Sequence, residues 1–239
     1  GLSSIIANPH LASSNGVGFD LFNSSVFQII EISSNIFLSK ILIFDGYNGE
    51  WEASIEEISK KSGVLFCIKQ TKPQIMPPDL WLFFSPLKKV RTDFIVEKAT
   101  ELGVAKIIPV QTEHTNADRI KLTRLSAHAI EAAEQCGGTY IPKIEELQKI
   151  NEVLENFPPD RSLLFCDEKL QASGINFKNL KKGKWAILVG PEGGFSEIER
   201  NYLKGLKFTF SISLGPRILR ADTAAVTAIS LWQNYLGDW

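Results

Sequence analysis

The sequence predicts an α/β protein in which a small β-rich N-terminal domain precedes a larger domain built on a parallel sheet. Three observations lead to this fold class. Up to about residue 70 the apolar runs are short, a proline-rich stretch at 70–78 then interrupts the chain, and beyond it strand-like and helix-like patterns alternate to the C-terminus. Alternating strands and helices favour a parallel sheet with helices covering its faces.

The N-terminal strands are predicted from apolar runs at 26–32, 41–44, 51–58 and 64–68. The second and third runs are joined by 45–49, which holds two glycines and an asparagine, the residues that accept positive φ in a tight connection. This pattern indicates a small antiparallel β domain or barrel. Proline disfavours both helix and central strand, so 70–78 is predicted to be a linker. We therefore expect a first domain at 1–72 and a second at 73–239.

The second domain is predicted to begin with a strand at 80–87, a continuous apolar run suited to burial on both faces. A helix should follow at 92–102, where Ile95, Ala99 and Leu102 are spaced for one helical face. Ser196 and Glu199 match a capping box, so a helix should start at Ser196. The other predicted strands are 107–110, 163–166, 186–189 and 208–214, and the other helical segments are 122–133, 147–157 and 223–235.

The formal net charge of −1 means that nucleic-acid binding would have to come from a local basic face. No Lys or Arg occurs between Gly1 and Ser39. Any phosphate-tracking surface should therefore lie on the C-terminal domain. The basic residues cluster there as Lys88, Lys89 and Arg91; as Arg119, Lys121 and Arg124; and as Lys178, Lys181, Lys182 and Lys184.

The cysteines and histidines are scattered, with no disulfide framework and no metal-ligand spacing, so we expect reduced thiols and no metal site. No apolar run approaches the roughly 20 residues needed to cross a bilayer, and the N-terminus lacks the basic start of a secretory signal. We expect a soluble, cytoplasmic protein without a membrane partner.

Two loops of the second domain carry the candidate site. The first, 189–195 (Val-Gly-Pro-Glu-Gly-Gly-Phe), follows a predicted strand and ends at the capped helix. Gly190, Gly193 and Gly194 lack Cβ, so the backbone can approach a ligand and free N–H groups can donate to it. The loop matches neither the Walker A pattern nor the dinucleotide fingerprint. By spacing alone, a tight turn between strand and helix explains it equally well.

The second loop, 214–220 (Leu-Gly-Pro-Arg-Ile-Leu-Arg), lies between the last predicted strand and the last predicted helix. Arg217 and Arg220 stand three residues apart among apolar residues, where guanidinium groups could hold phosphate or stabilise negative charge. The alternative is a pair of ordinary surface arginines, with Asp222 as the N-cap of the helix. Asp222 could also serve both purposes.

Several linked segments, in order, resemble a known family. They are 97–104 (Glu-Lys-Ala-Thr-Glu-Leu-Gly-Val), 107–110 (Ile-Ile-Pro-Val), 131–137 (Glu-Ala-Ala-Glu-Gln-Cys-Gly), 188–195 and 214–225. Together they span roughly residues 80–235, and their combination is similar to the 16S ribosomal RNA uridine-N3 methyltransferases, the RsmE family of the SPOUT superfamily. Two positions depart from the family: Gly138 stands where Arg is frequent, and Asp222 where Glu is usual.

The resemblance implies a C-terminal SPOUT domain with a trefoil knot, preceded by a PUA-like β-barrel that helps to hold RNA. It also implies a homodimer, S-adenosyl-L-methionine as cofactor, and methylation of N3 of a specific uridine in 16S rRNA, within the 30S subunit. Open alternatives are another SPOUT methyltransferase acting on tRNA or on a ribose 2′-oxygen, a non-catalytic RNA-binding module of the same fold, and a nucleotide-phosphate enzyme using the glycine loop.

The resemblance also assigns residues. It makes Arg220 the first candidate for pairing with the uracil oxygens or a neighbouring phosphate, with Arg217 in support. The proton acceptor stays open among Glu134, Glu192, Asp222 and solvent. The residues implied to hold the cofactor, largely through backbone groups, are Leu188, Gly190, Glu192, Gly193, Leu214, Gly215, Ile218 and Leu219.

Overall fold

The computed structural model describes residues 4–6, 12–13, 16–20, 40–58, 62–170, 177 and 180–239. The chain forms two compact units. The first comprises 1–76 together with 133–141, and the second comprises 77–132 and 142–239. The sequence did not indicate that 133–141 groups with the N-terminal part of the chain.

The first unit contains a six-stranded sheet in the order β1-β4-β5-β6-β3-β2, antiparallel except for the parallel pair of β1 and β4. Its strands are β1 (Ser4–Ile6), β2 (Ala12–Ser13), β3 (Gly16–Asp20), β4 (Lys40–Phe44), β5 (Glu50–Ile58) and β6 (Ser62–Lys72). The predicted N-terminal β-sheet is confirmed, whereas the run at 26–32 lies outside the described residues. Closure into a PUA-like barrel stays a prediction.

The ends of these strands follow local chemistry. Gly46 and Gly49 both have positive φ in the connection between β4 and β5, as their sequence context indicates. Strand β6 continues to Lys72, which pairs with Glu50, so the expected linker start at residue 70 was too early. Pro73 follows directly, and because proline has no backbone N–H, it cannot extend the ladder.

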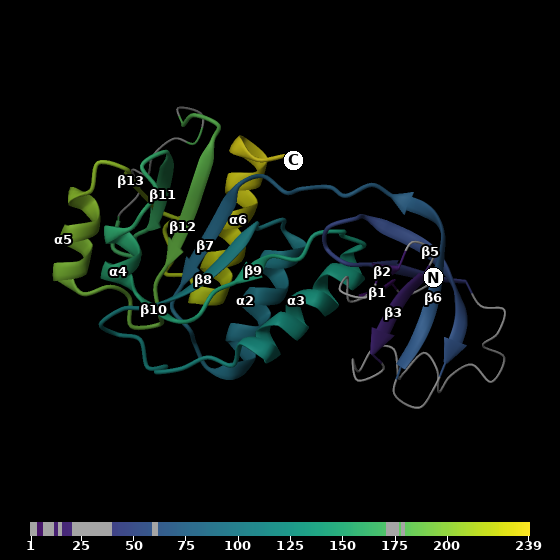
Figure 1. The fold of residues 1–239 in the computed structure, drawn as a ribbon. Coiled ribbons are helices and arrows are strands. Elements are labelled where there is room, and N and C mark those ends of the chain that lie inside the picture. The colour runs from purple at the N-terminus through teal and green to yellow at the C-terminus, as the bar shows by residue number, and fades with distance from the viewer. Residues whose placement is uncertain are drawn as a thin grey trace. The chain divides into compact units, whose positions relative to one another are not determined.

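The second unit contains a parallel sheet in the order β10-β8-β7-β12-β11-β13, with β9 paired to β8 (Figure 1). Its strands are β7 (Leu80–Phe84), β8 (Lys106–Gln111), β9 (Lys143–Ile144), β10 (Gln148–Lys149), β11 (Arg161–Cys166), β12 (Lys184–Val189) and β13 (Thr209–Ile212). The predicted α/β class with a parallel sheet is confirmed. The trefoil knot stays a prediction, because the connection from β11 to β12 includes residues outside the described ranges.

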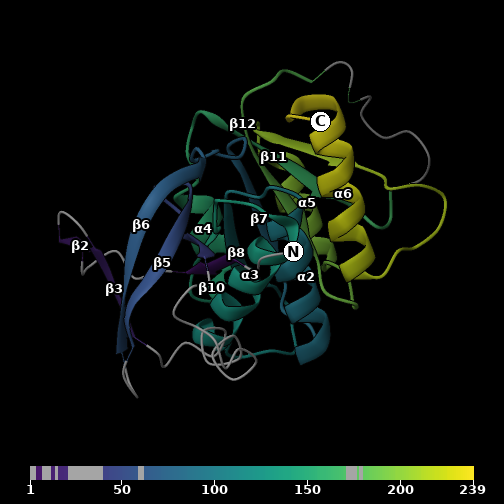
Figure 2. The same ribbon diagram turned by 90° about the vertical axis from the view of Figure 1, so that its right-hand side faces the viewer.

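Helices cover both faces of this sheet. The helices are α2 (Lys89–Glu101), α3 (Leu122–Cys136), α4 (Ile150–Glu155), α5 (Glu197–Gly205) and α6 (Ala221–Leu236). Helices α4 and α5 pack on one face through Ile150, Leu154 and Leu203, which share a core with Phe83 and Leu188. Helices α2 and α6 lie side by side, with α6 against β12 (Figures 1 and 2). No helix in the described part of the chain is long and apolar enough to cross a membrane.

Two predicted strands were too long, and both corrections matter for the site. Strand β7 ends at Phe84 because a turn follows, in which the hydroxyl of Thr92 accepts from Leu87 N–H and donates to Leu87 C=O. Helix α2 accordingly begins at Lys89, earlier than expected. Strand β13 ends at Ile212, so the whole of 213–220 is free to form a loop.

Candidate active site

The carboxyl ends of β11, β12 and β13 meet at one edge of the parallel sheet, and the segments that follow them enclose a cavity of about 210 Å³. This is the position at which open parallel sheets bind ligands, because the loops there converge without being part of the ladder. The cavity is lined by Cys166, Asp167, Glu168, Val189, Gly190, Pro191, Glu192, Gly194, Ile212, Ser213, Leu214, Gly215, Arg217, Ile218, Leu219, Arg220, Ala221 and Ala224.

Most of the residues predicted from the sequence meet in this cavity. Those that line it are Gly190, Glu192, Leu214, Gly215, Arg217, Ile218, Leu219 and Arg220. Leu188, Gly193 and Asp222 do not line it. The side chain of Leu188 belongs to the core beneath α4 and α5, because alternate residues of β12 point to opposite faces of the sheet.

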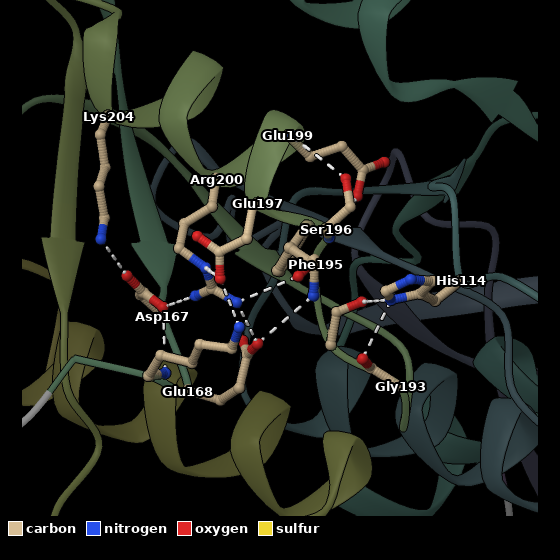
Figure 3. Close-up of polar contacts among 12 residues, drawn as sticks. His114, Asp167, Glu168, Gly193, Phe195, Ser196, Glu197, Glu199, Arg200 and Lys204 are labelled. Carbon is tan, nitrogen blue, oxygen red and sulfur yellow. Dashed lines mark hydrogen bonds and ion pairs between the residues drawn. The ribbon is translucent and has the colours of Figure 1, made fainter.

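Gly193 and Asp222 are held by other contacts nearby. The carbonyl oxygens of Gly193 and Gly194 each lie 3.1 Å from Nδ1 of His114, which comes from the loop after β8 (Figure 3). Asp222, in the first turn of α6, pairs with Arg91, with 3.7 Å between Oδ2 and Nε. Glu134, the third candidate proton acceptor, does not line the cavity either.

The glycines of the first loop are required by close packing inside the loop. A Cβ on Gly190 would lie 2.6 Å from the ring of Phe195, which is buried in the core. Gly194 has φ of +66°, and a Cβ there would lie 2.3 Å from Glu168 Oε1. Both distances are shorter than any side chain tolerates, so these positions need glycine whatever the ligand.

A buried ion-pair network joins the first loop to the end of β11 (Figure 3). Arg200, on α5, pairs with Asp167, donates to Glu168 Oε1 at 2.6 Å, and donates to the carbonyl oxygen of Phe195 at 3.1 Å. Lys204, one turn further along α5, lies 2.8 Å from the second oxygen of Asp167. Arg200 and Asp167 are buried, where charges are stable only with partners, and the hydrogen bond from Arg200 holds the more exposed carboxylate of Glu168 at the cavity wall.

The start of α5 shows the capping box that the sequence predicts. Ser196 Oγ accepts from the N–H of Glu199 at 3.3 Å, and Glu199 Oε2 accepts from the N–H of Ser196 at 3.0 Å. The other oxygen of Glu199 accepts from the N–H of Glu113 at 2.8 Å, so one side chain caps the helix and also holds the loop after β8. The direction in which the glycine loop enters α5 is thereby fixed from two sides.

Arg91 links the two predicted loops. Its Nη1 lies 3.1 Å from Glu192 Oε1 in the first loop, and its Nε pairs with Asp222 just after the second loop. Two of the candidate proton acceptors are therefore tied to one cation from α2. Their carboxylate oxygens can still accept a hydrogen bond from a cationic or N–H group of a ligand.

The remaining polar residues of the wall differ in their chemical availability. Arg217 and Arg220 are exposed at the cavity and form no ion pair within the described part of the chain. Burial, with a smaller effect of nearby Glu168, raises the pKa of the Cys166 thiol to about 12. Cys166 therefore stays a neutral thiol near pH 7 and is no nucleophile, whereas the two arginines can meet an anionic ligand.

Comparison with known proteins decides the family. The family model described as RNA methyltransferase domain matches residues 75–233. The ribosomal RNA small subunit methyltransferase E of Rickettsia conorii is 35% identical over 79% of this chain and 78% of its own length, and that of Buchnera aphidicola subsp. Acyrthosiphon pisum is 31% identical over 82% and 80%. The chain belongs to this RNA methyltransferase family.

Solved structures agree with this membership. The ribosomal RNA small subunit methyltransferase E from Neisseria gonorrhoeae, bound to S-adenosyl methionine, superposes with a TM-score of 0.83 at 26% identity, covering 100% of both chains. A Legionella pneumophila protein in complex with the bound cofactor SAM gives a TM-score of 0.85 at 26% identity, again over 100% of both chains. The methyltransferase fold thus extends over both units of the chain.

Sequence reasoning missed four residues of the candidate site: Asp167 and Glu168 in the cavity wall, and Arg200 and Arg91, which pair with residues of that wall. Glu168 and Arg200 are 32 residues apart and Arg91 and Glu192 are 101 apart, so no local motif joins them. One signal was available, because Asp167 and Glu168 directly follow an apolar strand at the edge where ligands bind. Among the described residues, no three His, Cys, Asp or Glu side chains gather as metal ligands.

Proposed function

We propose that this chain methylates small-subunit ribosomal RNA with S-adenosylmethionine as the methyl donor, and that the target atom is N3 of a uridine. The observation that carries the proposal is the cavity at the ends of β11, β12 and β13, in a fold that matches over its full length a methyltransferase bound to S-adenosyl methionine. The names of the curated relatives supply the substrate class.

The cavity fits such a cofactor. Ile212, Leu214 and Leu219 offer an apolar wall for an adenine ring, and backbone groups beside them can recognise its edge. Glu168 and Glu192 supply carboxylates for the cationic groups of the cofactor. A Cβ on Gly215, which has φ of +116°, would meet nothing within 4 Å, so this stretch of backbone is open to a ligand.

The chemical task left to the protein is alignment and charge stabilisation. When bound, S-adenosylmethionine supplies an already activated methyl group, so no covalent nucleophile is needed. The chain must hold the uracil with N3 facing that methyl and stabilise the negative charge that appears as N3 loses its proton. Arg220 is proposed to pair with the uracil oxygens or the neighbouring phosphate, with Arg217 in support, because both line the cavity with free guanidinium groups.

Proton removal is assigned to no single group. Glu192 lines the cavity, and Asp222 lies next to it in α6, but both carboxylates are paired with Arg91. Solvent is the third acceptor, and the pH dependence of the reaction separates them. With a carboxylate base, the rate rises as the carboxylate loses its proton and is constant at higher pH. With solvent as acceptor, the rate keeps rising with pH towards the pKa of the uracil itself.

We also propose that the enzyme works as a homodimer in the cytoplasm, where its ribosomal substrate is found. Exposed apolar side chains of the second unit support the dimer: Val90 and Phe94 on α2 are 78% and 39% exposed, and Ile218 in the second loop is 84% exposed. Groups of exposed apolar side chains mark interfaces more often than single exposed apolar residues do. Light scattering coupled to gel filtration checks the assembly state.

Labelled S-adenosylmethionine, incubated with the protein and with 30S subunits or free 16S RNA lacking the modification, tests the substrate. The expected result is label in 16S RNA at N3 of one uridine, and label in tRNA alone would overturn the assignment.

Replacing Arg220 with alanine should lower methyl transfer while cofactor binding by calorimetry changes little. Lys207→Ala, an exposed cation outside the site, is the matched control, and unchanged turnover in Arg220→Ala removes Arg220 from the mechanism.

A further inference from the structure

A second cavity of the second unit, of about 410 Å³, is lined by cations and lies apart from the cofactor cavity. We call it the basic cleft. Its wall comes from the turn before α2, the first residues of α2, and the loop that leads into α3. The lining residues are Pro86, Leu87, Lys89, Thr92, Ala117, Arg119, Ile120, Lys121 and Arg124. Two basic clusters about 30 residues apart in the sequence thus meet in one hollow, with no acidic residue in its lining.

Most of the positive charge in the basic cleft is uncompensated. Lys89, Arg119 and Lys121 are exposed and form no ion pair within the described part of the chain. Arg124 is the exception, because both of its terminal nitrogens lie 3.3 Å from the oxygens of Asp93, which fixes its guanidinium at the wall. Although the whole chain has a formal net charge of −1, these unpaired cations lie together in one concave site and create a local potential that attracts anions.

The start of α2 strengthens this potential. Lys88 is the N-cap residue and makes no side-chain capping hydrogen bond, and the first turn contains no acidic residue. Helix N-termini carry a partial positive charge and ordinarily prefer Asp or Glu. Lysines at this end raise the electrostatic energy of the free protein, and an anion bound in the basic cleft would relieve it.

The lining also indicates which part of a nucleic acid fits. No aromatic side chain is among the lining residues, so a base has nothing to stack on. The exposed side chains of Lys89, Arg119 and Lys121 match phosphate oxygens, and phosphate contacts position a nucleic acid without reading its sequence.

The basic cleft is coupled to the cofactor cavity through two shared segments. Lys89 lines the cleft while Arg91, two residues later in α2, pairs with Glu192 of the cofactor cavity. The loop after β8 supplies Arg119 and Lys121 to the cleft, and its earlier residue His114 contacts the glycine loop. An RNA strand held at the cleft is thus positioned by the same two segments that shape the reaction site.

We propose that the basic cleft binds backbone phosphates of the RNA substrate and so positions the strand whose nucleotide enters the cofactor cavity. This inference rests on the proposed function for the identity of the RNA. It adds a binding site outside the reaction centre, formed by Lys89, Arg119 and Lys121.

The test compares two triple variants that remove equal charge. In the first, Lys89, Arg119 and Lys121 are replaced by Gln; in the second, Lys181, Lys182 and Lys207, which are exposed and unpaired among the described residues, are replaced by Gln. Binding to protein-free 16S rRNA is measured by filter binding across a KCl titration, and cofactor binding by calorimetry. Unfolding midpoints establish that both variants are folded.

Each phosphate contact contributes a slope of about 0.7 in log K against log salt for a single strand, or about fivefold in affinity at 0.1 M salt. The cleft variant should therefore lose about 2 from the slope and roughly a hundredfold in affinity, while its cofactor affinity stays that of the unaltered protein. Equal slopes in the two variants would overturn the proposed role of the basic cleft and leave the proposed function untouched. A loss seen with intact 30S subunits but absent with protein-free rRNA would also overturn it, because the cleft would then contact a ribosomal protein. Failure of the unaltered protein to bind either 16S rRNA or 30S subunits would instead overturn the proposed function.

Discussion

Replacing Arg200 with alanine should lower both the stability of the protein and its affinity for the cofactor. Arg200 is 3% exposed, and it neutralises Asp167, whose side chain is 0% exposed. Without Arg200, Asp167 keeps Lys204 as its cation, and Glu168 loses the donor that holds it at the cavity wall. Removing one side of a buried ion pair costs about 3–5 kcal/mol, and Lys204, which is 40% exposed, compensates the buried carboxylate of Asp167 only in part.

The expected size of both effects is measurable. A loss of about 3–5 kcal/mol corresponds to a fall in Tm of roughly 6–20 °C for a chain of this size. Because native proteins have about 5–15 kcal/mol of stability, calorimetry of cofactor binding is done at a temperature at which the unfolding curve of the variant shows it to be folded. The Kd for S-adenosylmethionine should rise about tenfold, which equals the loss of one charge-assisted hydrogen bond of about 1.4 kcal/mol that orders the wall.

Arg161 provides the matched control, since it is also a buried arginine with a carboxylate partner. Its Nη2 lies 2.7 Å from Asp79, and its guanidinium stacks on Trp81, at the opposite end of β11 from the cavity. Arg161→Ala should also destabilise the protein, by less than Arg200→Ala because the side chain of Asp79 is 42% exposed, and should leave the Kd for the cofactor unchanged. Equal Kd values for the two variants would refute the positioning role of Arg200, and a Tm change below about 2 °C in Arg200→Ala would refute the ion-pair reasoning.

Three other predictions concern stability and the link between the loops. Burial raises the pKa of Cys166 from its ordinary value of 9.0 to about 12, so the stability that its protonated thiol provides is present below pH 9 and lost as the pH rises from 9 towards 12. Urea unfolding should show a loss of up to about 1.4 kcal/mol per pH unit in that range, with a smaller loss in Cys166→Ala than in the exposed-site control Cys136→Ala. Ser196→Ala should cost about 0.5–2 kcal/mol by the same assay, because the capping box is lost, and unaltered stability would contradict the capping role. Arg91→Ala removes partly exposed ion pairs and should change the free energy of unfolding by less than about 1 kcal/mol. It should raise the KM for the cofactor, because Glu192 is no longer held by Arg91. A KM equal to that of the unaltered enzyme would show that this link between the loops does not matter for cofactor binding.

The fold was predictable where local chemistry decides it. Ser196 and Glu199 stand at capping-box spacing, and the structure shows both hydrogen bonds of the box. Element ends were harder, because tertiary contacts set them: β7 stops where Thr92 closes a turn onto Leu87, and β6 runs on to Lys72 because Glu50 pairs with it. The grouping of 133–141 with the first unit carries no local signal at all.

The site was predictable to the extent that it consists of consecutive residues. Gly190, Glu192, Arg217 and Arg220 lie in loops whose position after strands could be read from apolar runs. Leu188 was predicted to hold the cofactor through backbone groups, and its side chain lies in the core because successive side chains of a strand point to opposite faces of the sheet. Nothing in the sequence indicated that Arg200 belongs to the site, because its partners Asp167 and Glu168 follow β11 and lie 33 and 32 residues earlier in the chain.

The glycine loop illustrates how much a motif says about a ligand. Gly190 is needed because the ring of Phe195 occupies the space of a Cβ, and Gly194 is needed because Glu168 does, while Gly215 in the second loop has open space around it. Two glycines of the first loop are therefore explained by packing within the protein, as an ordinary turn between strand and helix would require. What distinguishes a cofactor wall is the combination with a second loop that leaves its backbone open at the same sheet edge. The two loops together form the wall that would hold the ligand. The sequence predicted that they come together only through the family resemblance of the whole set of segments.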